Sequence, residues 1–444
     1  MNILVTGGGG REHALVWKLR QSPGVGRIFV APGNAGTEEI VENAAFEINR
    51  SANSPRHSHI LQNVRMSAAH PPIECFDDMI HFCQDEKIDL VVVGPDDHLA
   101  GGIVDSLQGA GIKVFGPTKR AAEIEWSKAF AKSFMQANGI PTARFAVFSD
   151  AGEAKRYLKS QKFPIVIKTS GLALGKGVVI ASFPAEARQA ITDMMEKKKF
   201  GEAGAEVVIE EHLIGREISI HAFCDGETAV LFPPAQDHKR AFDGDRGPNT
   251  GGMGTIAPVS WVTPEMMSEI EKQIVLPALQ GLAKMGRSFI GILFPGLMIT
   301  ADGPKVLEFN ARFGDPEAQS YMRLLKTDLL EILLACVDGK LANLKIKWED
   351  KAACCVVLAS GGYPGAYQRG FEITGLNKLK ARAVIFQAGT KRVNGILTTN
   401  GGRVLGVTAT GADLKTALAR AYAGIERIHF KDMHFRRDIG AKSV

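Results

Sequence analysis

The stretch Val306–Gln319 reads VLEFNARFGDPEAQ and is the most informative segment of the chain. Side chains alternate between the two faces of a strand, so a strand here directs Leu307 and Phe309 to one face. The opposite face then carries a carboxylate, an amide and a guanidinium, on Glu308, Asn310 and Arg312. Carboxylate and amide oxygens suit Mg²⁺, and a guanidinium suits a phosphate. The stretch predicts a metal–phosphate site, although a salt-bridged edge strand would fit the same residues.

Size and composition indicate an ordinary globular protein. The 444 residues correspond to roughly two to four domains. Hydrophobic residues make up 45% of the chain and charged residues 23%, which is enough apolar material for a core. The net charge of +5 is too small to indicate nucleic acid and is equally compatible with a small anionic substrate.

Cysteine usage and the N-terminus indicate a cytoplasmic protein. None of the six cysteines forms a C-x-x-C pair, and no cysteine–histidine cluster has zinc spacing. The first ten residues, MNILVTGGGG, lack the basic segment and the long apolar run of a signal peptide. No apolar run approaches the length of a membrane span. We therefore expect neither a membrane nor a nucleic-acid partner.

Strands alternate with helices in residues 1–118. Apolar strands are expected at Asn2–Thr6, Arg27–Ala31, Ile88–Val93 and Lys113–Phe115, with a helix at Glu12–Gln21. This alternation predicts a doubly wound, parallel α/β domain. Residues 49–72 are polar, contain several histidines and lack clear periodicity, so we expect a surface insertion there.

Four glycines, at positions 7–10, connect the first strand to the first helix. Backbone N–H groups at such a helix N-terminus can bind a phosphate. A dinucleotide site would need a third glycine where His13 stands and an acidic residue where Pro32 ends the second strand. The pattern favours a phosphate-bearing substrate over NAD or FAD, and a purely structural turn remains the alternative.

Residues 119–335 are expected to form an α+β core with a smaller subdomain at about 142–205. In this subdomain Lys168 ends a strand, and the loop SGLALGKG at 170–177 follows it. The N–H groups of a glycine-rich loop can close over a triphosphate while Lys168 and Lys176 neutralise its charge. Taken alone, such a loop is more often an ordinary turn.

Two further segments of the core contain candidate binding groups. The strand at 207–211 ends in two carboxylates, and Glu217 follows the next turn. These residues could bind adenine and ribose, and the alternative is an ordinary hairpin with exposed acidic side chains. Residues 233–258 are rich in glycine and charge and are expected to form a long functional loop. For His238 in this loop, structural or substrate hydrogen bonds are favoured over catalysis. Residues 336–444 predict a small mixed α/β domain of short strands and one helix.

The order of these motifs resembles the ATP-grasp fold, in which two α+β subdomains clamp ATP. Longer motifs resemble the glycinamide ribonucleotide synthetase family, whose members are phosphoribosylamine–glycine ligases. This likeness covers nearly the whole chain outside the 49–72 insertion. Its motifs are GGREHA at 9–14, APGNAG at 31–36, QDHKR at 236–240, GPNTGGMG at 247–254, RFGDPE at 312–317, GGYP at 361–364 and TNGGR at 399–403.

The resemblance implies a multidomain enzyme with an N-terminal parallel α/β domain, a two-part ATP-grasp core and a C-terminal mixed α/β domain. The implied reaction joins glycine to 5-phosphoribosylamine through a glycyl phosphate, with ATP as co-substrate, in de novo purine biosynthesis. Positioning and charge neutralisation carry such chemistry without a protein nucleophile. The implied cofactor is Mg²⁺ or Mn²⁺, and we expect a monomer.

The resemblance also implies roles for individual residues. The metal ligands are Glu308 and Asn310. The residues expected around ATP are Lys128, Lys168, Gly175, Lys176, Gly177, Glu210, Glu211, Leu213 and Glu217. Those expected around the other substrates are Gly9, Gly10, Asn34, Asp245 and Arg312, and the catalytic groups among all of these are Arg312, Lys176 and Asp245.

The chain departs from the family pattern at three places. Ser170 replaces a lid aspartate, the loop at 94–99 reads GPDDHL, and Phe294 stands where the family has a tyrosine. Three other readings remain as alternatives: a different ATP-grasp ligase or carboxylase, a non-catalytic nucleotide-binding protein, and a Rossmann oxidoreductase. The intact Lys176 and Glu308 favour an active enzyme over the second of these.

Overall fold

The computed structural model describes residues 1–44, 76–173, 177–376 and 383–443. The predicted insertion at 49–72 and the lid residues Gly175 and Lys176 therefore lie outside the described residues. Within the described part, no helix is both long and apolar enough to cross a membrane.

A five-stranded parallel sheet of order β3-β2-β1-β4-β5 forms the N-terminal part, as predicted. Its strands are β1 (Ile3–Gly7), β2 (Ile28–Pro32), β3 (Glu42–Asn43), β4 (Leu90–Val93) and β5 (Val114–Phe115). The connecting helices are α1 (Gly10–Leu19), α2 (Ala35–Glu38), α3 (Asp77–Asp85), α4 (Asp96–Gly101) and α5 (Ile103–Gly109). The central strand β1 is buried along its whole length, which explains why its sequence is continuously apolar.

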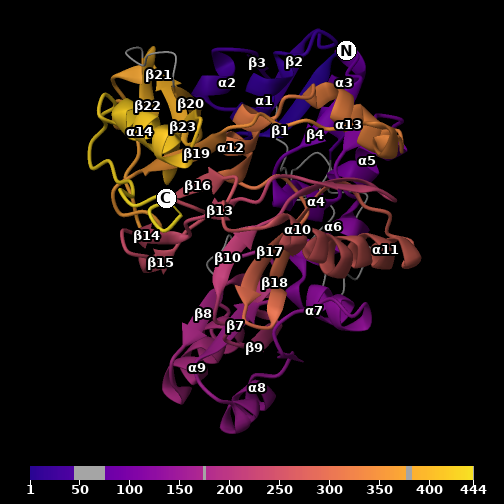
Figure 1. Cartoon of the computed structure of the whole chain (residues 1–444), viewed down its shortest axis with the longest axis vertical. Coiled ribbons are helices and arrows are strands. Elements are labelled where there is room, and N and C mark those ends of the chain that lie inside the picture. Colours follow the sequence, from indigo (N-terminus) through magenta and orange to yellow (C-terminus); the bar gives the residue numbers. More distant parts are fainter. Residues whose placement is uncertain (45–75, 174–176, 377–382, 444) are drawn as a thin grey trace, which may run out of the picture.

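A separate four-stranded antiparallel sheet of order β6-β9-β7-β8 projects from the molecule and occupies the lower part of Figure 1. Its strands are β6 (Phe145–Phe148), β7 (Ile165–Thr169), β8 (Val178–Ala181) and β9 (Val207–Glu211). The helices α8 (Ala151–Tyr157) and α9 (Pro184–Ile191) complete this unit, which has a hydrophobic cluster of its own. Helices α6 (Lys119–Trp126) and α7 (Lys128–Ala137) connect it to the N-terminal part.

A second antiparallel sheet, of order β10-β17-β11-β12, lies at the centre, and β18 adds to β17. Its strands are β10 (Arg216–Ser219), β11 (Ala222–Asp225), β12 (Ala229–Leu231), β17 (Ile290–Thr300) and β18 (Gly303–Asn310). The helical segment beside this sheet consists of α10 (Pro264–Ile270) and α11 (Leu276–Lys284), joined by a π-helical turn at Glu271–Val275. Pro277 explains this wide turn, because proline donates no hydrogen bond to the preceding turn of a helix.

The expectation of a long loop at 233–258 is wrong, because this segment contributes four strands. They are β13 (Gln236–Asp237), β14 (Arg240–Phe242), β15 (Arg246–Asn249) and β16 (Gly254–Ala257). Strands β13 and β16 join a five-stranded sheet of order β13-β16-β19-β23-β20, whose other members come from the C-terminal part: β19 (Ala352–Ala359), β20 (Ala383–Gln387) and β23 (Arg403–Gly411). The sequence could not show this pairing, because the partner strand β19 lies about a hundred residues further along the chain.

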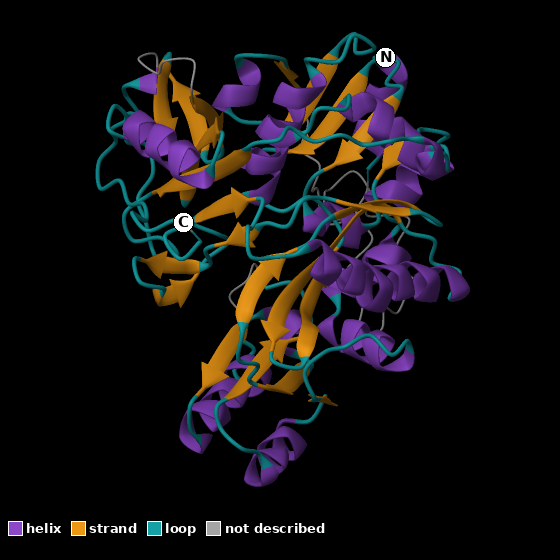
Figure 2. Ribbon diagram, in the orientation of Figure 1, coloured by secondary structure: helices purple, strands orange, loops and turns teal. Residues whose placement is uncertain are grey.

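The remaining elements pack around these sheets, with strands at the centre and helices mostly outside them (Figure 2). They are the hairpin β21 (Thr390–Val393) and β22 (Ile396–Thr399) and the helices α12 (Glu317–Leu324), α13 (Leu329–Val337) and α14 (Leu414–Ile425). Together with the sheets, these helices confirm the predicted combination of parallel α/β, antiparallel α+β and mixed C-terminal parts.

A bulge in β18 changes which side chains of the opening stretch share a face. Gly296 of β17 pairs with Glu308, but the next residue of β17, Leu297, pairs with Val306, so Leu307 is skipped. Val306 and Phe309 are buried, whereas Leu307 is only half-buried. The prediction that Leu307 and Phe309 share one face is therefore wrong. The alternation beyond the bulge still places Glu308 and Asn310 on one face.

Phe309 provides a test of this packing, since its side chain is 2% exposed within the main hydrophobic cluster. We expect Phe309→Ala to lower the free energy of unfolding by about 3–5 kcal/mol, because it removes buried apolar surface and leaves a cavity. Urea denaturation measures this change. The control is Ile396→Ala, at a 49% exposed position, for which a change of under about 0.5 kcal/mol is expected. Equal losses for both variants would contradict the packing described.

Candidate active site

Glu210, in β9, is buried between two lysines. Its carboxylate oxygens lie 3.0 Å from Lys168 Nζ and 3.1 Å from Lys132 Nζ. Lys168 also donates to the carbonyl of Leu307 at 3.0 Å, so the bulge of β18 anchors this lysine across two sheets. Burial lowers the pKa of Lys132 to about 8, although Glu210 opposes this shift. Two cations around one carboxylate leave an excess positive charge, which suits an anionic ligand.

Glu308 lies near several cations. Lys239 Nζ is 3.7 Å from Glu308 Oε1 and 3.6 Å from Glu217 Oε2. Burial alone would raise the pKa of Glu308, but the charges of Lys239, Lys128 and Lys168 lower it to about 2. Glu308 is therefore ionised at any ordinary pH. Its side chain is 35% exposed, so it can also reach a ligand.

Asn310 and Arg312 continue this polar face. Asn310 Nδ2 donates to the carbonyl of Phe294 at 3.2 Å, which directs Asn310 Oδ1 away from the strand pair. Arg312 Nη2 lies 3.3 Å from Asn310 Oδ1 and 3.0 Å from Glu125 Oε1. The three residues predicted as a metal–phosphate group thus lie together, and Glu125 holds the guanidinium in place.

Glu125, a residue without any signal in the sequence, is buried one residue before the end of α6. Its Oε2 accepts a hydrogen bond from the backbone N–H of Ala311 at 2.8 Å. Burial raises the pKa of Glu125 to about 7, although the charge of Arg312 opposes this shift. The carboxyl group therefore titrates near neutral pH, at the point where β18 enters the turn at 313–317.

The turn at 313–317 is held by arginines from both ends of the chain. Arg11 Nη1, from α1, donates to the carbonyl of Phe313 at 2.9 Å. Arg403, at the start of β23, donates from Nη1 to the carbonyl of Asp315 at 2.5 Å and pairs through Nη2 with its carboxylate at 3.4 Å. The N-terminal and C-terminal parts thus meet at one short segment.

The central sheet holds the same turn from a third side. The backbone N–H of Gly314 donates to His221 Nε2 at 3.2 Å, and Ser219 Oγ donates to Glu317 Oε1 at 2.9 Å. Both partners lie at the junction of β10 and β11. Three parts of the molecule therefore determine the position of a segment only five residues long.

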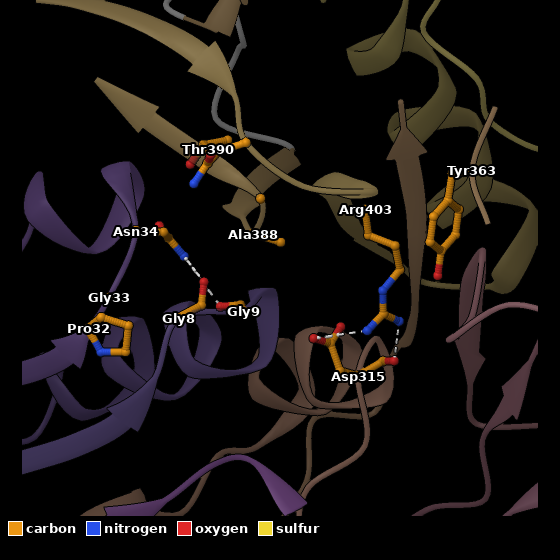
Figure 3. Close-up of a pocket in the computed structure, with 12 residues that line it drawn as sticks. Gly8, Gly9, Pro32, Gly33, Asn34, Asp315, Tyr363, Ala388, Thr390 and Arg403 are labelled. Atoms are coloured by element: carbon orange, nitrogen blue, oxygen red, sulfur yellow. Dashed lines mark hydrogen bonds and ion pairs between the residues drawn. The ribbon is translucent and has the colours of Figure 1, made fainter. Parts of the chain in front are cut away.

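A cavity of about 370 Å³ opens beside this turn, between the N-terminal and C-terminal parts (Figure 3). The side chain of Asn34 donates to the carbonyls of Gly8 and Gln387, both at 2.9 Å, and so ties one wall together. On the other side Arg403 reaches Asp315, next to Tyr363. The lining residues are Gly8, Gly9, Pro32, Gly33, Asn34, Asp315, Tyr363, Ala388, Gly389, Thr390, Asn400 and Arg403.

Asp237 and Glu317 carry neighbouring carboxylates, since the charge of Glu317 acts on Asp237. Burial, followed by the charge of Glu317, raises the pKa of Asp237 well above its ordinary value, while Lys239 and Arg403 oppose the shift. Burial also raises the pKa of Glu317. Asp237 Oδ1 is buried and has no hydrogen-bond partner among the described residues. An incoming ammonium group or a shared proton would relieve this repulsion.

Other residues named from the sequence lie in less direct positions. Asp245 pairs with Arg436 at 2.8 Å and Lys442 at 2.6 Å, so its carboxylate is engaged with the C-terminal segment. Glu211 pairs with Arg144 at 2.8 Å, and Leu213 is half-buried in the loop after β9. Gly177, the described end of the lid, approaches Thr169 so closely that a side chain would not fit.

The glycine turn of the N-terminal part is also partly engaged. The N–H of Gly9 donates to Glu12 Oε2 at 2.6 Å, so this group is not free to bind a phosphate. Gly10 packs against Gln319, and Gly9 reaches the cavity. His238 Nδ1 lies 3.0 Å from the carbonyl of Gly254, and His238 Nε2 accepts from Gly440 at 3.0 Å, a structural arrangement.

Sequence reasoning missed several residues of the site, namely Lys132, Lys239, Glu125, Asp237, Asp315, Tyr363, Asn400 and Arg403. Six of them lie inside motifs named above, since QDHKR contains Asp237 and Lys239, RFGDPE contains Asp315, GGYP contains Tyr363, and TNGGR contains Asn400 and Arg403. Lys132 and Glu125 carried no local signal, because each side chain faces a partner more than seventy residues away.

The chemistry of the polar face fits a divalent cation. In the described part of the chain, His, Cys, Asp and Glu form no group of three or more that could hold a metal. A metal here would be held by the ionised Glu308 and the oxygen of Asn310, and it would neutralise the charge of a bound phosphate.

The sheets, the buried lysine pair and this polar face define an ATP-grasp protein. The fold also matches the structure of a biotin carboxylase from Campylobacter jejuni, with a TM-score of 0.70 at 13% identity over 98% of this chain and 92% of that one. Models of phosphoribosylglycinamide synthetase match the chain at residues 1–125 (N domain), 126–318 (ATP-grasp domain) and 353–442 (C domain). The chain belongs to the phosphoribosylglycinamide synthetase family.

Individual relatives show the same similarity over the full length. The phosphoribosylamine–glycine ligase of Caldanaerobacter subterraneus is 46% identical over 99% of this chain and 100% of its own. The structure of the phosphoribosylamine–glycine ligase of Thermotoga maritima matches with a TM-score of 0.80 at 33% identity, over 99% of this chain and all of that one. A trifunctional purine biosynthetic protein of Gallus gallus is 49% identical, and the chain spans 42% of its length.

The elevated pKa of Glu125 gives a prediction about stability and pH. The pKa of Glu125 is about 7 in the folded protein and near 4.5 in the unfolded protein. Between pH 4.5 and pH 7 the folded state therefore binds more protons at this group than the unfolded state does. Stability from this group is therefore present below about pH 4.5 and is lost as the pH rises to about 7. Relative to Glu125→Gln, the wild type should lose up to about 1.4 kcal/mol per pH unit in this window.

Urea denaturation at several pH values from 4.5 to 8 measures this difference. The matched control is Glu227→Gln, at an exposed position. Parallel stability curves for the wild type and Glu125→Gln would contradict the assignment.

Proposed function

We propose that this chain ligates glycine to 5-phosphoribosylamine, with ATP as co-substrate, giving glycinamide ribonucleotide, ADP and phosphate in de novo purine biosynthesis. Relatives named for this activity match it over their whole length, which supports the proposal. The observation that carries it is the turn at 313–317. This turn joins the polar face of Glu308 and Asn310 to the cavity beside Asp315, where ATP and the ribosylamine would bind.

The reaction takes place in two transfers. A carboxylate oxygen of glycine attacks the γ-phosphorus of ATP, and ADP leaves. The amine then attacks the acyl carbon of glycyl phosphate, phosphate leaves with the electron pair of the broken C–O bond, and the amine loses a proton. Both steps concentrate negative charge on phosphoryl oxygens, so preorganised cations lower the barriers.

The described residues divide this work. Lys128 and Lys168, with Lys176 and the lid, would neutralise the phosphates of ATP, and Glu210 would hold the lysines in place. Glu308 and Asn310 would hold Mg²⁺ or Mn²⁺, whose charge would polarise the phosphates of ATP. Arg312 would face the transferred phosphoryl group. Glu211 and Leu213 would lie near adenine, and Glu217 near the ribose.

The other substrates would occupy the space around the turn at 313–317. The cavity lined by Gly9, Asn34 and Arg403 has the size and donors for a ribose phosphate. The ammonium group of glycine would lie beside Asp237 and Glu317, where it would replace a shared proton. Asp245 would belong to this substrate site, and its ion pairs to Arg436 and Lys442 would orient its carboxylate.

We further propose a division of the chain into domains at 1–118, 119–335 with a lid at about 142–205, and 336–444. The lid unit has its own hydrophobic cluster, which supports its movement as one body. We also propose that the protein is a monomer and that it acts in the cytoplasm.

Release of phosphate from ATP tests the function. It should require glycine, freshly prepared 5-phosphoribosylamine and Mg²⁺ together, and an equal rate with bicarbonate would refute the proposal. Glu308→Ala should lower turnover by at least about a thousandfold, since it removes the charged metal ligand. Asp302→Ala, at an 82% exposed side chain on the same hairpin, is the control and should keep wild-type turnover. Retained turnover in Glu308→Ala would contradict the metal role.

Arg403→Gln tests the cavity. This change removes a charged donor that holds Asp315 and lines the cavity, so KM for phosphoribosylamine should rise by about 10- to 100-fold. KM for ATP should stay within about twofold, because Arg403 lies away from the lysine pair. Steady-state kinetics measure both constants, with the exposed Lys415→Gln as control. An equal rise in both KM values would indicate a general structural defect.

A further inference from the structure

His221 is a fully buried histidine between the central sheet and the turn at 313–317. Its ring stacks on Phe294 with 3.9 Å between the ring centroids and an angle of 19° between the planes. Its Nε2 lies 3.2 Å from the N–H of Gly314, and its Nδ1 lies 3.3 Å from the hydroxyl of Tyr321. Both ring nitrogens thus have partners on the segment that carries Asp315 and Glu317.

These contacts determine the state of the ring. The N–H of Gly314 can only donate, so Nε2 must be the unprotonated nitrogen and Nδ1 must carry the hydrogen, which it donates to Tyr321. Burial, followed by the charge of Arg312, lowers the pKa of His221 well below its ordinary value. The neutral ring is therefore the stable form, and it remains an acceptor for Gly314.

His221 also connects the turn to the metal face. Phe294, on which the ring stacks, pairs with Asn310 across β17 and β18, and its carbonyl accepts from Asn310 Nδ2 at 3.2 Å. A continuous set of contacts therefore joins Asn310, Phe294, His221 and Gly314. A side chain at Gly314 would meet His221 Nε2 at 2.9 Å, so the close approach requires glycine.

We propose that His221 is a positioning residue, which holds the turn at 313–317 at a set distance from the metal face through its hydrogen bond to Gly314. The inference rests on the proposed function for its kinetic consequences. Asp315 contacts the ribosylamine cavity and Glu317 belongs to the carboxylate pair, so a shift of the turn misplaces both groups relative to the phosphoryl group. Small errors of this kind strongly reduce the rate of a reaction between two bound substrates.

Two substitutions separate positioning from packing. His221→Phe keeps an aromatic ring on Phe294 but removes the acceptor, and His221→Gln loses the ring but can still accept from Gly314. We expect His221→Phe to lower kcat/KM for phosphoribosylamine about tenfold or more, because the buried N–H loses its partner. His221→Gln should stay within about threefold of the wild type. KM for ATP should change less than about twofold in both variants, since Lys168 and Lys132 contact other elements.

The opposite order, with His221→Phe active and His221→Gln impaired, would overturn the inference and assign a packing role. If His221→Phe does not fold, His221→Asn replaces it, because its shorter amide reaches toward Tyr321 and not Gly314. Hydrogen exchange of the peptide containing 313–317 provides a readout independent of ligase activity. Faster exchange in His221→Phe than in His221→Gln supports the inference even if the wild type does not ligate glycine, whereas equal exchange would contradict it.

Discussion

The hydrogen bonds that hold the turn at 313–317 from three sides are the constraint on which the rest of the site depends. Arg11 from the N-terminal part, His221 from the central sheet and Arg403 from the C-terminal part each pair with a main-chain group of this turn. A buried main-chain group without a partner costs about 1–3 kcal/mol. All three hydrogen bonds of the turn form together in the arrangement that the three parts adopt here. That arrangement places the cavity beside the polar face.

The electrostatics of the site follow from incomplete compensation. Near Lys168, positive charge exceeds the negative charge of the surrounding carboxylates. Near Asp237, negative charge exceeds the positive charge of the surrounding cations. Each imbalance is costly in a buried setting, and each would be relieved by a ligand of the opposite charge. Nucleotide phosphates answer the first imbalance and an ammonium group the second. The folded protein thus keeps two unfavourable charge arrangements that the binding of phosphates and of an ammonium group would relieve. This is expected for an enzyme that binds charged substrates before it excludes water.

The strand that first indicated the site shows how far local patterns reach. Alternation correctly placed Glu308 and Asn310 on one face and Phe309 on the other, because both depend only on backbone geometry. It failed at Leu307, which the bulge leaves without a partner on β17 and whose carbonyl accepts a hydrogen bond from Lys168. The bulge depends on the register of β17 and on a lysine from another sheet. Neither can be deduced from the residues of β18 alone.

The sequence by itself determined the order of elements, the parallel N-terminal sheet, the residue types of the polar face and the motifs that resemble the family. These are local properties, set by periodicity and by the chemistry of neighbouring residues. Only the tertiary structure decided that β13 and β16 join the C-terminal sheet, that Glu210 lies between Lys132 and Lys168, and that Asp245 faces Arg436. Those contacts join residues far apart in the chain, and their energies depend on burial and geometry that arise only when the parts have assembled.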